Sequence, residues 1–240
     1  MVLFAIVGEL GTGKTLSAVA LTFRNWFSKN KVVYSNIPLY KIPYHLIESV
    51  EQLDAMRNGV VLADEMWTLI NARRAISKRN QLVSSILLKS RKRELIYFFT
   101  TQTMSLIDKV VRQMIDFTAY PVLMGGDVYR NEPFTVCKLY VFKGYSQRLN
   151  PSQLFRTIIY KTYLVYEMYD TNYEVSDIIE NEKPDGFKII FQEDKNSKPI
   201  YFDNWEDANN YARNYWNNYL KNEEVKYWFP FDDILVENKL

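Results

Sequence analysis

The sequence predicts an α/β fold in which helices flank a central, mostly parallel sheet. Two apolar runs lead to this prediction. The first, residues 2–7, has the length and composition of a buried parallel strand, and a helical pattern over residues 14–28 follows it. The second, residues 60–63, ends in two acids, Asp64 and Glu65. Because parallel α/β sheets bind ligands at the carboxyl ends of their strands, both runs are expected to end at a functional site.

The segment between the first strand and the first helix, residues 8–15, matches the phosphate-loop pattern G-x-x-x-x-G-K-[ST]. Glycines at these positions let backbone N–H groups wrap a phosphate without Cβ clashes, and the helix N-terminus adds the positive end of its dipole. The pattern therefore predicts ATP binding. The candidate nucleotide-binding residues are Gly8, Glu9, Leu10, Gly11, Thr12, Gly13, Lys14, Thr15 and Leu16.

The two motifs together predict hydrolysis of the bound nucleotide. Lys14 is expected to reach the β- and γ-phosphates, and Thr15 to ligate Mg²⁺. Asp64 is the second expected Mg²⁺ ligand, held directly or through water. Glu65 is expected to polarise the attacking water, because it follows Asp64 at the carboxyl end of the strand. ATP and Mg²⁺ are thus the expected cofactors.

A third buried strand, residues 95–99, leads into Thr100, Thr101 and Gln102. A polar side chain at the end of a strand beside the phosphate loop is placed to hydrogen-bond the γ-phosphate or the attacking water. Gln102 is therefore the candidate sensor of the nucleotide, with a plain strand cap as the alternative.

The most basic part of the chain is residues 71–93, which hold eight Lys or Arg residues and no acid. Their middle, residues 82–88, is apolar at helical spacing and predicts a helix with basic ends. Three uses stay open: contact with nucleic-acid phosphates, an arginine finger for a neighbouring subunit, or a solvated surface. The candidate fingers are Arg73, Arg74, Arg79, Arg91 and Arg93.

The remaining sequence predicts further β structure and one long helix. Residues 105–113 indicate a helix capped by Ser105, residues 116–123 another strand, and residues 134–142 a hairpin at the sheet edge. Beyond residue 175 we expect a hairpin over residues 187–201 and an amphipathic helix over residues 203–220. The predicted organisation is an ATPase core, 1–175, and a small α+β C-terminal appendage, 176–240.

Composition excludes several classes of site. A single cysteine, Cys137, excludes an internal disulfide and a cysteine-based zinc site, and a single histidine, His45, excludes a cluster of histidine ligands. His45 follows Pro43 in a connecting stretch and is expected to be a surface or loop residue. No apolar run approaches the roughly 18 residues of a membrane span, and no leader is apparent, so a cytoplasmic protein is expected.

The net charge of +2 is unevenly distributed. Residues 1–160 carry 21 Lys or Arg against 11 Asp or Glu, whereas residues 161–240 carry 9 against 17. A basic core with an acidic remainder indicates a polyanionic partner for the core.

The phosphate loop, the Asp64–Glu65 pair and the strand ending in Thr101 and Gln102 together resemble the additional-strand, RecA-like P-loop ATPases. Within them, the sequence resembles the FtsK/HerA branch, and particularly Zot-like and viral genome-packaging ATPases, including those of archaeal viruses. A further point of resemblance to Zot-like proteins is Tyr169-Asp170-Thr171. The resemblance covers residues 1–175 and implies that the Gln102 strand lies between the strands of the two motifs.

The resemblance also implies a function and partners. It implies a homo-oligomeric ring, a hexamer or pentamer, that hydrolyses ATP and translocates double-stranded DNA, with a virion or portal protein as a further partner. An arginine from the neighbouring subunit would complete each site. The first alternative is a Zot-like virion-assembly or secretion ATPase acting on protein at a membrane. The others are a nucleotide-dependent switch and a small-molecule kinase.

Overall fold

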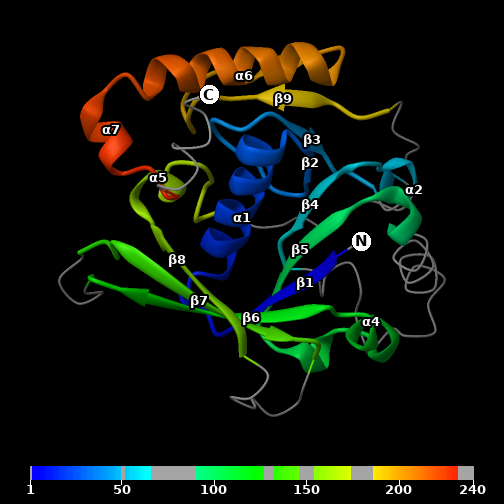
Figure 1. Cartoon of the computed structure of the whole chain (residues 1–240). Helices are drawn as coiled ribbons and strands as arrows, with labels where there is room; N and C mark the ends of the chain where they lie inside the picture. Colours follow the sequence, from blue (N-terminus) through cyan, green and yellow to red (C-terminus); the bar gives the residue numbers. More distant parts are fainter. Residues whose placement is uncertain are drawn as a thin grey trace.

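The computed structural model describes residues 2–49, 52–65, 90–126, 132–145, 154–173 and 186–231. Their strands form a 10-stranded sheet in the order β10-β9-β3-β2-β4-β5-β1-β6-β7-β8 (Figure 1). The strands are β1 (Val2–Val7), β2 (Val32–Ser35), β3 (Tyr44–Leu46), β4 (Gly59–Ala63), β5 (Ile96–Thr101), β6 (Phe117–Met124), β7 (Val136–Lys143), β8 (Leu154–Lys161), β9 (Ile189–Phe191) and β10 (Ile200–Phe202).

The middle of the sheet is parallel. β5 pairs in parallel with β1 on one side and with β4 on the other, so that Ile96 lies opposite both Val2 and Val60. The strand that leads to Gln102 therefore lies between the strands of the two nucleotide motifs, as the family resemblance implied. This order brings the carboxyl ends of β1, β4 and β5 together at one edge of the sheet.

Two hydrophobic layers cover the two faces of the sheet. Alternate residues of β1 enter different layers: Phe4 and Ile6 face the layer under α1 (Lys14–Lys29), and Leu3 and Ala5 face the opposite one. The α1 layer also contains α5 (Tyr163–Tyr166) and α6 (Trp205–Tyr219). The opposite layer contains α2 (Gln52–Ala55) and α4 (Lys109–Gln113). The short helices η3 (Ser90–Arg93), η4 (Met104–Leu106) and α7 (Glu223–Tyr227) complete the described elements.

At one end of the sheet, β6, β7 and β8 form an antiparallel meander. The expected edge hairpin is therefore confirmed. β8 is an additional strand that the sequence did not predict, because four of its first five residues are exposed and leave little alternation to detect.

At the other end, the C-terminal residues join the same sheet. β9 pairs antiparallel with both β3 and β10, which confirms the predicted hairpin, and α6 lies along β9 (Figure 1). The Asn209 side chain of α6 accepts a 2.9 Å hydrogen bond from the Trp26 indole of α1. The ring centroids of Trp216, also in α6, and Phe23 of α1 lie 4.9 Å apart. Residues 186–231, which the sequence assigned to an appendage, thus share the sheet and the hydrophobic core of the phosphate-loop half.

Three local expectations have different outcomes. His45 lies in β3 with its ring stacked between Tyr34 and Trp205, so the expectation of a surface or loop residue is wrong. The predicted helix over residues 105–113 is two short helices, because Thr103 caps η4 and Asp108 caps α4. The helix with basic ends that was predicted around the apolar residues 82–88 lies outside the described residues. In the described part of the chain, no helix combines the length and hydrophobicity that crossing a membrane requires.

Candidate functional site: a nucleotide cavity at the carboxyl edge of the sheet

The phosphate loop has the geometry that its glycines predict. Gly11 and Gly13 adopt positive φ angles of 76° and 89°. A Cβ atom at Gly13 would also lie 2.9 Å from the Leu123 side chain of β6. The backbone angle therefore favours glycine at position 13, and a side chain there would also displace Leu123.

Gly13 is also the N-cap of α1, and it supplies no side chain to cap the helix. The first turn of α1 contains no acidic residue that would balance the positive end of the helix dipole. The unpaired N–H groups of a helix start and the positive dipole end favour an anion at this position. The loop and the start of α1 thus fit a phosphate group.

Lys14 extends back over this loop. Its ammonium group donates a 2.7 Å hydrogen bond to the Glu9 carbonyl, which the Thr12 hydroxyl also contacts at 2.8 Å. Burial lowers the pKa of Lys14, while the nearby carboxylates of Asp64 and Glu65 act against that shift. The Lys14 ammonium lies at the phosphate loop, where the sequence predicted it.

Asp64 is the centre of a buried polar cluster at the end of β4. Its carboxylate accepts hydrogen bonds from the Thr15 hydroxyl, at 3.0 and 3.1 Å, and from the Thr100 hydroxyl, at 2.6 Å. Asn36 fixes the backbone of Asp64 with two further hydrogen bonds, of 2.8 and 2.9 Å. Burial raises the pKa of Asp64, and the hydrogen bonds from Thr100 and Thr15 oppose this rise.

The two residues predicted as metal ligands therefore face one another. A hydroxyl oxygen of Thr15 and the carboxylate of Asp64 are oxygen donors of the kind that Mg²⁺ prefers. The carboxylate is 8% exposed, and its burial makes a bound cation a favourable partner for its charge. The donor set fits Mg²⁺.

Glu65 follows Asp64 in an unusual backbone conformation, with a φ angle of 49°. Its backbone N–H donates a 2.8 Å hydrogen bond to the Thr100 hydroxyl. Strained backbone of this kind is typical of functional sites, where surrounding contacts hold it in place. Glu65 lines the same cavity as Lys14 and Thr15, which agrees with its predicted place beside the phosphates.

Thr100 lines the cavity and was not singled out from the sequence. It is 1% exposed, and its hydroxyl donates to Asp64 and accepts from the Glu65 backbone, so it links the two acids to β5. Gln102, the predicted sensor, is exposed just past the end of β5 and is not among the described residues that line the cavity. The sequence signal that could have identified Thr100 is a β-branched, polar residue directly after the apolar residues 95–99 of the strand.

Of the arginines predicted as finger candidates, the structure describes Arg93 and the backbone of Arg91, and both precede β5. Arg93 precedes β5, at the opposite end of this strand from Thr100, and its largely buried side chain forms an ion pair with Asp54 of α2. The backbone of Arg91 belongs to η3 at the same end. Arg73, Arg74 and Arg79 lie outside the described residues.

The cavity itself has a volume of about 610 Å³, within the range of small-molecule sites. Part of its lining, the phosphate part, consists of Lys14, Thr15, Asp64, Glu65 and Thr100. Leu123, which lies close to Gly13, also lines the cavity. A tyrosine-rich segment forms the tyrosine part of the lining and contributes Tyr166, Tyr169, Thr171 and Tyr173. The sequence analysis noted Tyr169 and Thr171 as points of family resemblance, but assigned none of these residues to the site.

Two proteins of known structure are similar to this chain. The N-terminal domain of zonular occludens toxin from Neisseria meningitidis is 22% identical, with a TM-score of 0.51 over 71% of this chain and 100% of that domain. The genome packaging NTPase B204 from Sulfolobus turreted icosahedral virus 2, in complex with sulfate, is 12% identical, with a TM-score of 0.41 over 65% of this chain and 94% of that chain. The complex of B204 with ATP-gammaS is 11% identical, with a TM-score of 0.40 over 65% of this chain and 95% of that chain.

The zonular occludens toxin domain bears the name of one of the groups that the sequence resembles. No protein-family model and no curated protein matches the sequence. At this level of identity, the similarity to the zonular occludens toxin domain shows a common α/β fold, in which helices flank a central, mostly parallel sheet.

Proposed function

We propose that the chain hydrolyses ATP and uses the energy to translocate double-stranded DNA, as a motor for viral genome packaging. The observation that carries the hydrolytic part is the junction of the two motifs. There, the Thr15 hydroxyl of the phosphate loop contacts the Asp64 carboxylate at 3.0 Å, and Thr100 joins Asp64 to the Glu65 backbone. A nucleotide switch would need the loop but not this arrangement of a second acid beside the first.

The phosphates of ATP would bind to the loop and the start of α1. Lys14 would exchange its hydrogen bond to the Glu9 carbonyl for one to a phosphate oxygen. Thr15 and Asp64 would hold Mg²⁺, which supplies neutralisation of the phosphate charge when bound. The hydroxyl of Thr100 would keep the Asp64 carboxylate oriented toward Thr15.

Glu65 would accept the proton of the attacking water. Its carboxylate is attached to a backbone that the hydrogen bond to Thr100 fixes, so the orientation of the acid depends on β5. A general base of this kind contributes about 10²- to 10⁴-fold to a rate.

The uneven charge supports DNA as the partner of the motor. Residues 1–160, which include the phosphate loop, Asp64, Glu65 and Thr100, have an excess of ten positive charges. A positive surface binds the DNA backbone and makes that binding sensitive to salt. A ring of subunits would add an arginine from each neighbour, which is worth about 10³- to 10⁵-fold in rate, so an isolated subunit is expected to be slow.

One observation favours a second function, a virion-assembly or secretion ATPase that acts on protein at a membrane. The fold similarity to the zonular occludens toxin domain extends over 100% of that domain. A protein-directed ATPase would use the same cavity and the same acids, but its rate would not respond to DNA.

The test is the steady-state ATPase rate with and without linear double-stranded DNA, with Glu65→Gln as the blank. Stimulation by DNA that steepens with protein concentration supports the DNA motor. Hydrolysis that is indifferent to DNA overturns the motor in favour of the assembly ATPase. The absence of hydrolysis in both conditions, with ATP still bound, overturns the enzymatic function and leaves a nucleotide switch.

A further inference from the structure

A single short segment supplies the tyrosines that line the cavity. It runs from α5 to Tyr173, and Tyr166, Tyr169 and Tyr173 all line the cavity that also contains Lys14 and Asp64. Three aromatic rings from one segment are more than a polar, phosphate-binding cavity requires. Aromatic rings are instead the surfaces on which nucleobases stack.

The three rings differ in depth. Tyr169 is 8% exposed and Tyr166 is half-buried, whereas Tyr173 is 39% exposed at the rim. Burial raises the pKa of Tyr166 and of Tyr169, so both phenols stay neutral at physiological pH and repel no phosphate. The segment therefore offers ring faces from the interior to the rim of the cavity.

The segment is anchored to the body of the protein. The backbone N–H of Tyr40 donates a 2.8 Å hydrogen bond to the Met168 carbonyl, and Leu39 forms an antiparallel bridge with Tyr169. These contacts attach the tyrosine segment to the chain that follows β2. The segment after β2 also contains Asn36, which forms two hydrogen bonds with the backbone of Asp64. The same segment therefore contacts both Asp64 and the tyrosine segment.

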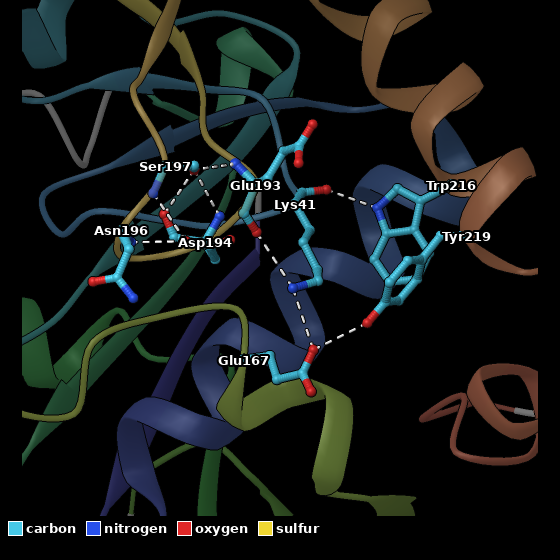
Figure 2. A network of polar contacts seen from close by, with 8 residues as sticks. All are labelled: Lys41, Glu167, Glu193, Asp194, Asn196, Ser197, Trp216 and Tyr219. Carbon is cyan, nitrogen blue, oxygen red and sulfur yellow. Dashed lines mark hydrogen bonds and ion pairs between the residues drawn. The ribbon is translucent and has the colours of Figure 1, made fainter.

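Residues from distant parts of the sequence complete the anchor (Figure 2). Lys41 forms a 3.2 Å ion pair with Glu167, which also accepts a 3.1 Å hydrogen bond from the Tyr219 hydroxyl of α6. The Trp216 indole of α6 donates to the Lys41 carbonyl at 2.7 Å. Helix α6 thus contacts the tyrosine segment through Tyr219 and contacts Lys41 through Trp216.

We propose that Tyr166, Tyr169 and Tyr173 form the nucleobase-binding wall of the nucleotide site. The inference rests on the proposed nucleotide function and specifies how the non-phosphate part of the substrate is held. Because every base has a π-face, stacking on this wall adds affinity for a nucleoside triphosphate over inorganic triphosphate. The phosphate loop alone gives no such preference.

The test compares the affinity for ATP with the affinity for inorganic triphosphate, measured by isothermal titration calorimetry in the full chain. The variants are Tyr173→Ala at the rim and Tyr166→Ala, with Tyr173→Phe as the conservative change. Tyr163→Ala is the matched control, because Tyr163 belongs to the same α5, is 50% exposed, packs 5.2 Å from Trp228 and does not line the cavity.

We expect both alanine variants to bind ATP about 5- to 30-fold more weakly and to bind inorganic triphosphate within twofold of the unaltered protein. Tyr163→Ala should bind both ligands normally, whereas Tyr173→Phe, which keeps the ring, should lose less ATP affinity than Tyr173→Ala. Unchanged ATP affinity in both alanine variants would overturn the inference, and so would an equal loss for the two ligands. Failure of the unaltered protein to bind either ligand would instead overturn the proposed function, and this inference with it.

Discussion

The phosphate part and the tyrosine part of the cavity lining are built in different ways. The phosphate part comes from a short motif and from residues at the carboxyl ends of β4 and β5, whose positions follow from parallel pairing alone. The tyrosine part comes from a segment held by Lys41, by Trp216 and by Tyr219. Backbone geometry positions the first part, whereas side-chain contacts between distant parts of the chain position the second.

The difference teaches what a motif encodes. A glycine-rich loop needs only φ angles and a helix start, so its eight residues specify the phosphate site locally. The tyrosine wall depends on a partner such as Trp216, which lies 175 positions from the Lys41 carbonyl that it contacts. Changes in the phosphate part should therefore impair chemistry, and changes around the tyrosine part should impair affinity and stability.

The largest effect is expected for Glu65→Gln. The substitution keeps the shape of the side chain but removes the base, so turnover should fall about 10²- to 10⁴-fold while ATP affinity stays within a few-fold. Steady-state rates and calorimetry measure the two quantities. Lys14→Ala is the contrasting variant, because it should lose binding as well. Normal turnover by Glu65→Gln would assign the water-activating role to another residue.

A smaller effect is expected for Thr100→Val, which keeps the β-branched shape and removes the hydroxyl. Asp64 then loses a donor and the Glu65 N–H loses an acceptor, so kcat should fall about 10- to 100-fold. Thr101→Val is the matched control, because the Thr101 hydroxyl bonds to the Thr103 carbonyl and not to the acids. If Gln102→Ala abolished turnover and Thr100→Val did not, the result would support the sensor role predicted for Gln102 and contradict the importance of the Thr100 hydroxyl.

His45 provides a test of how firmly the C-terminal helix is joined to the sheet. Burial lowers the pKa of His45 to about 4, from its usual value of 6.5. The folded state therefore favours the neutral ring, and this stabilisation is complete above pH 6.5 and is lost as the pH falls toward 4. At pH 5 the loss should amount to about 2 kcal/mol of unfolding free energy.

The measurement is urea unfolding at pH 7 and pH 5, for the unaltered protein and for His45→Phe. The variant keeps a ring between Tyr34 and Trp205 and removes the titrating group, so its stability should fall less between the two pH values. An identical fall in both proteins would show that His45 is not protected from water by Trp205.

The smallest effect is expected for Glu167→Gln, outside the cavity. The ion pair with Lys41 is lost, while the amide still accepts a hydrogen bond from Tyr219, so the tyrosine segment should loosen without unfolding. ATP should bind about two- to fivefold more weakly, with inorganic triphosphate unchanged. Glu193→Gln is the control, because Lys41 contacts the Glu193 carbonyl and not its side chain. Weaker binding of both ligands would indicate a disturbed phosphate loop.

Much of the fold follows from the sequence because its signals are local. The apolar run of β1, the loop and α1 form a contiguous unit, and the position of β5 between β1 and β4 followed from the family resemblance. His45 was misplaced because its burial comes from Trp205, which belongs to a distant helix. Thr100 was passed over for Gln102 because β5 continues to Thr101, beyond the apolar residues that marked the strand.

The most direct test is a crystal structure of the Glu65→Gln variant with ATP and Mg²⁺. We expect the triphosphate to lie along residues 8–15, with the Lys14 ammonium in contact with its phosphates. Mg²⁺ should lie between Thr15 and Asp64, and the base should lie against Tyr166 and Tyr173. A triphosphate bound away from the loop would contradict the proposed site. A base that pointed away from the tyrosines would contradict the division of the cavity lining into a phosphate part and a base-binding part.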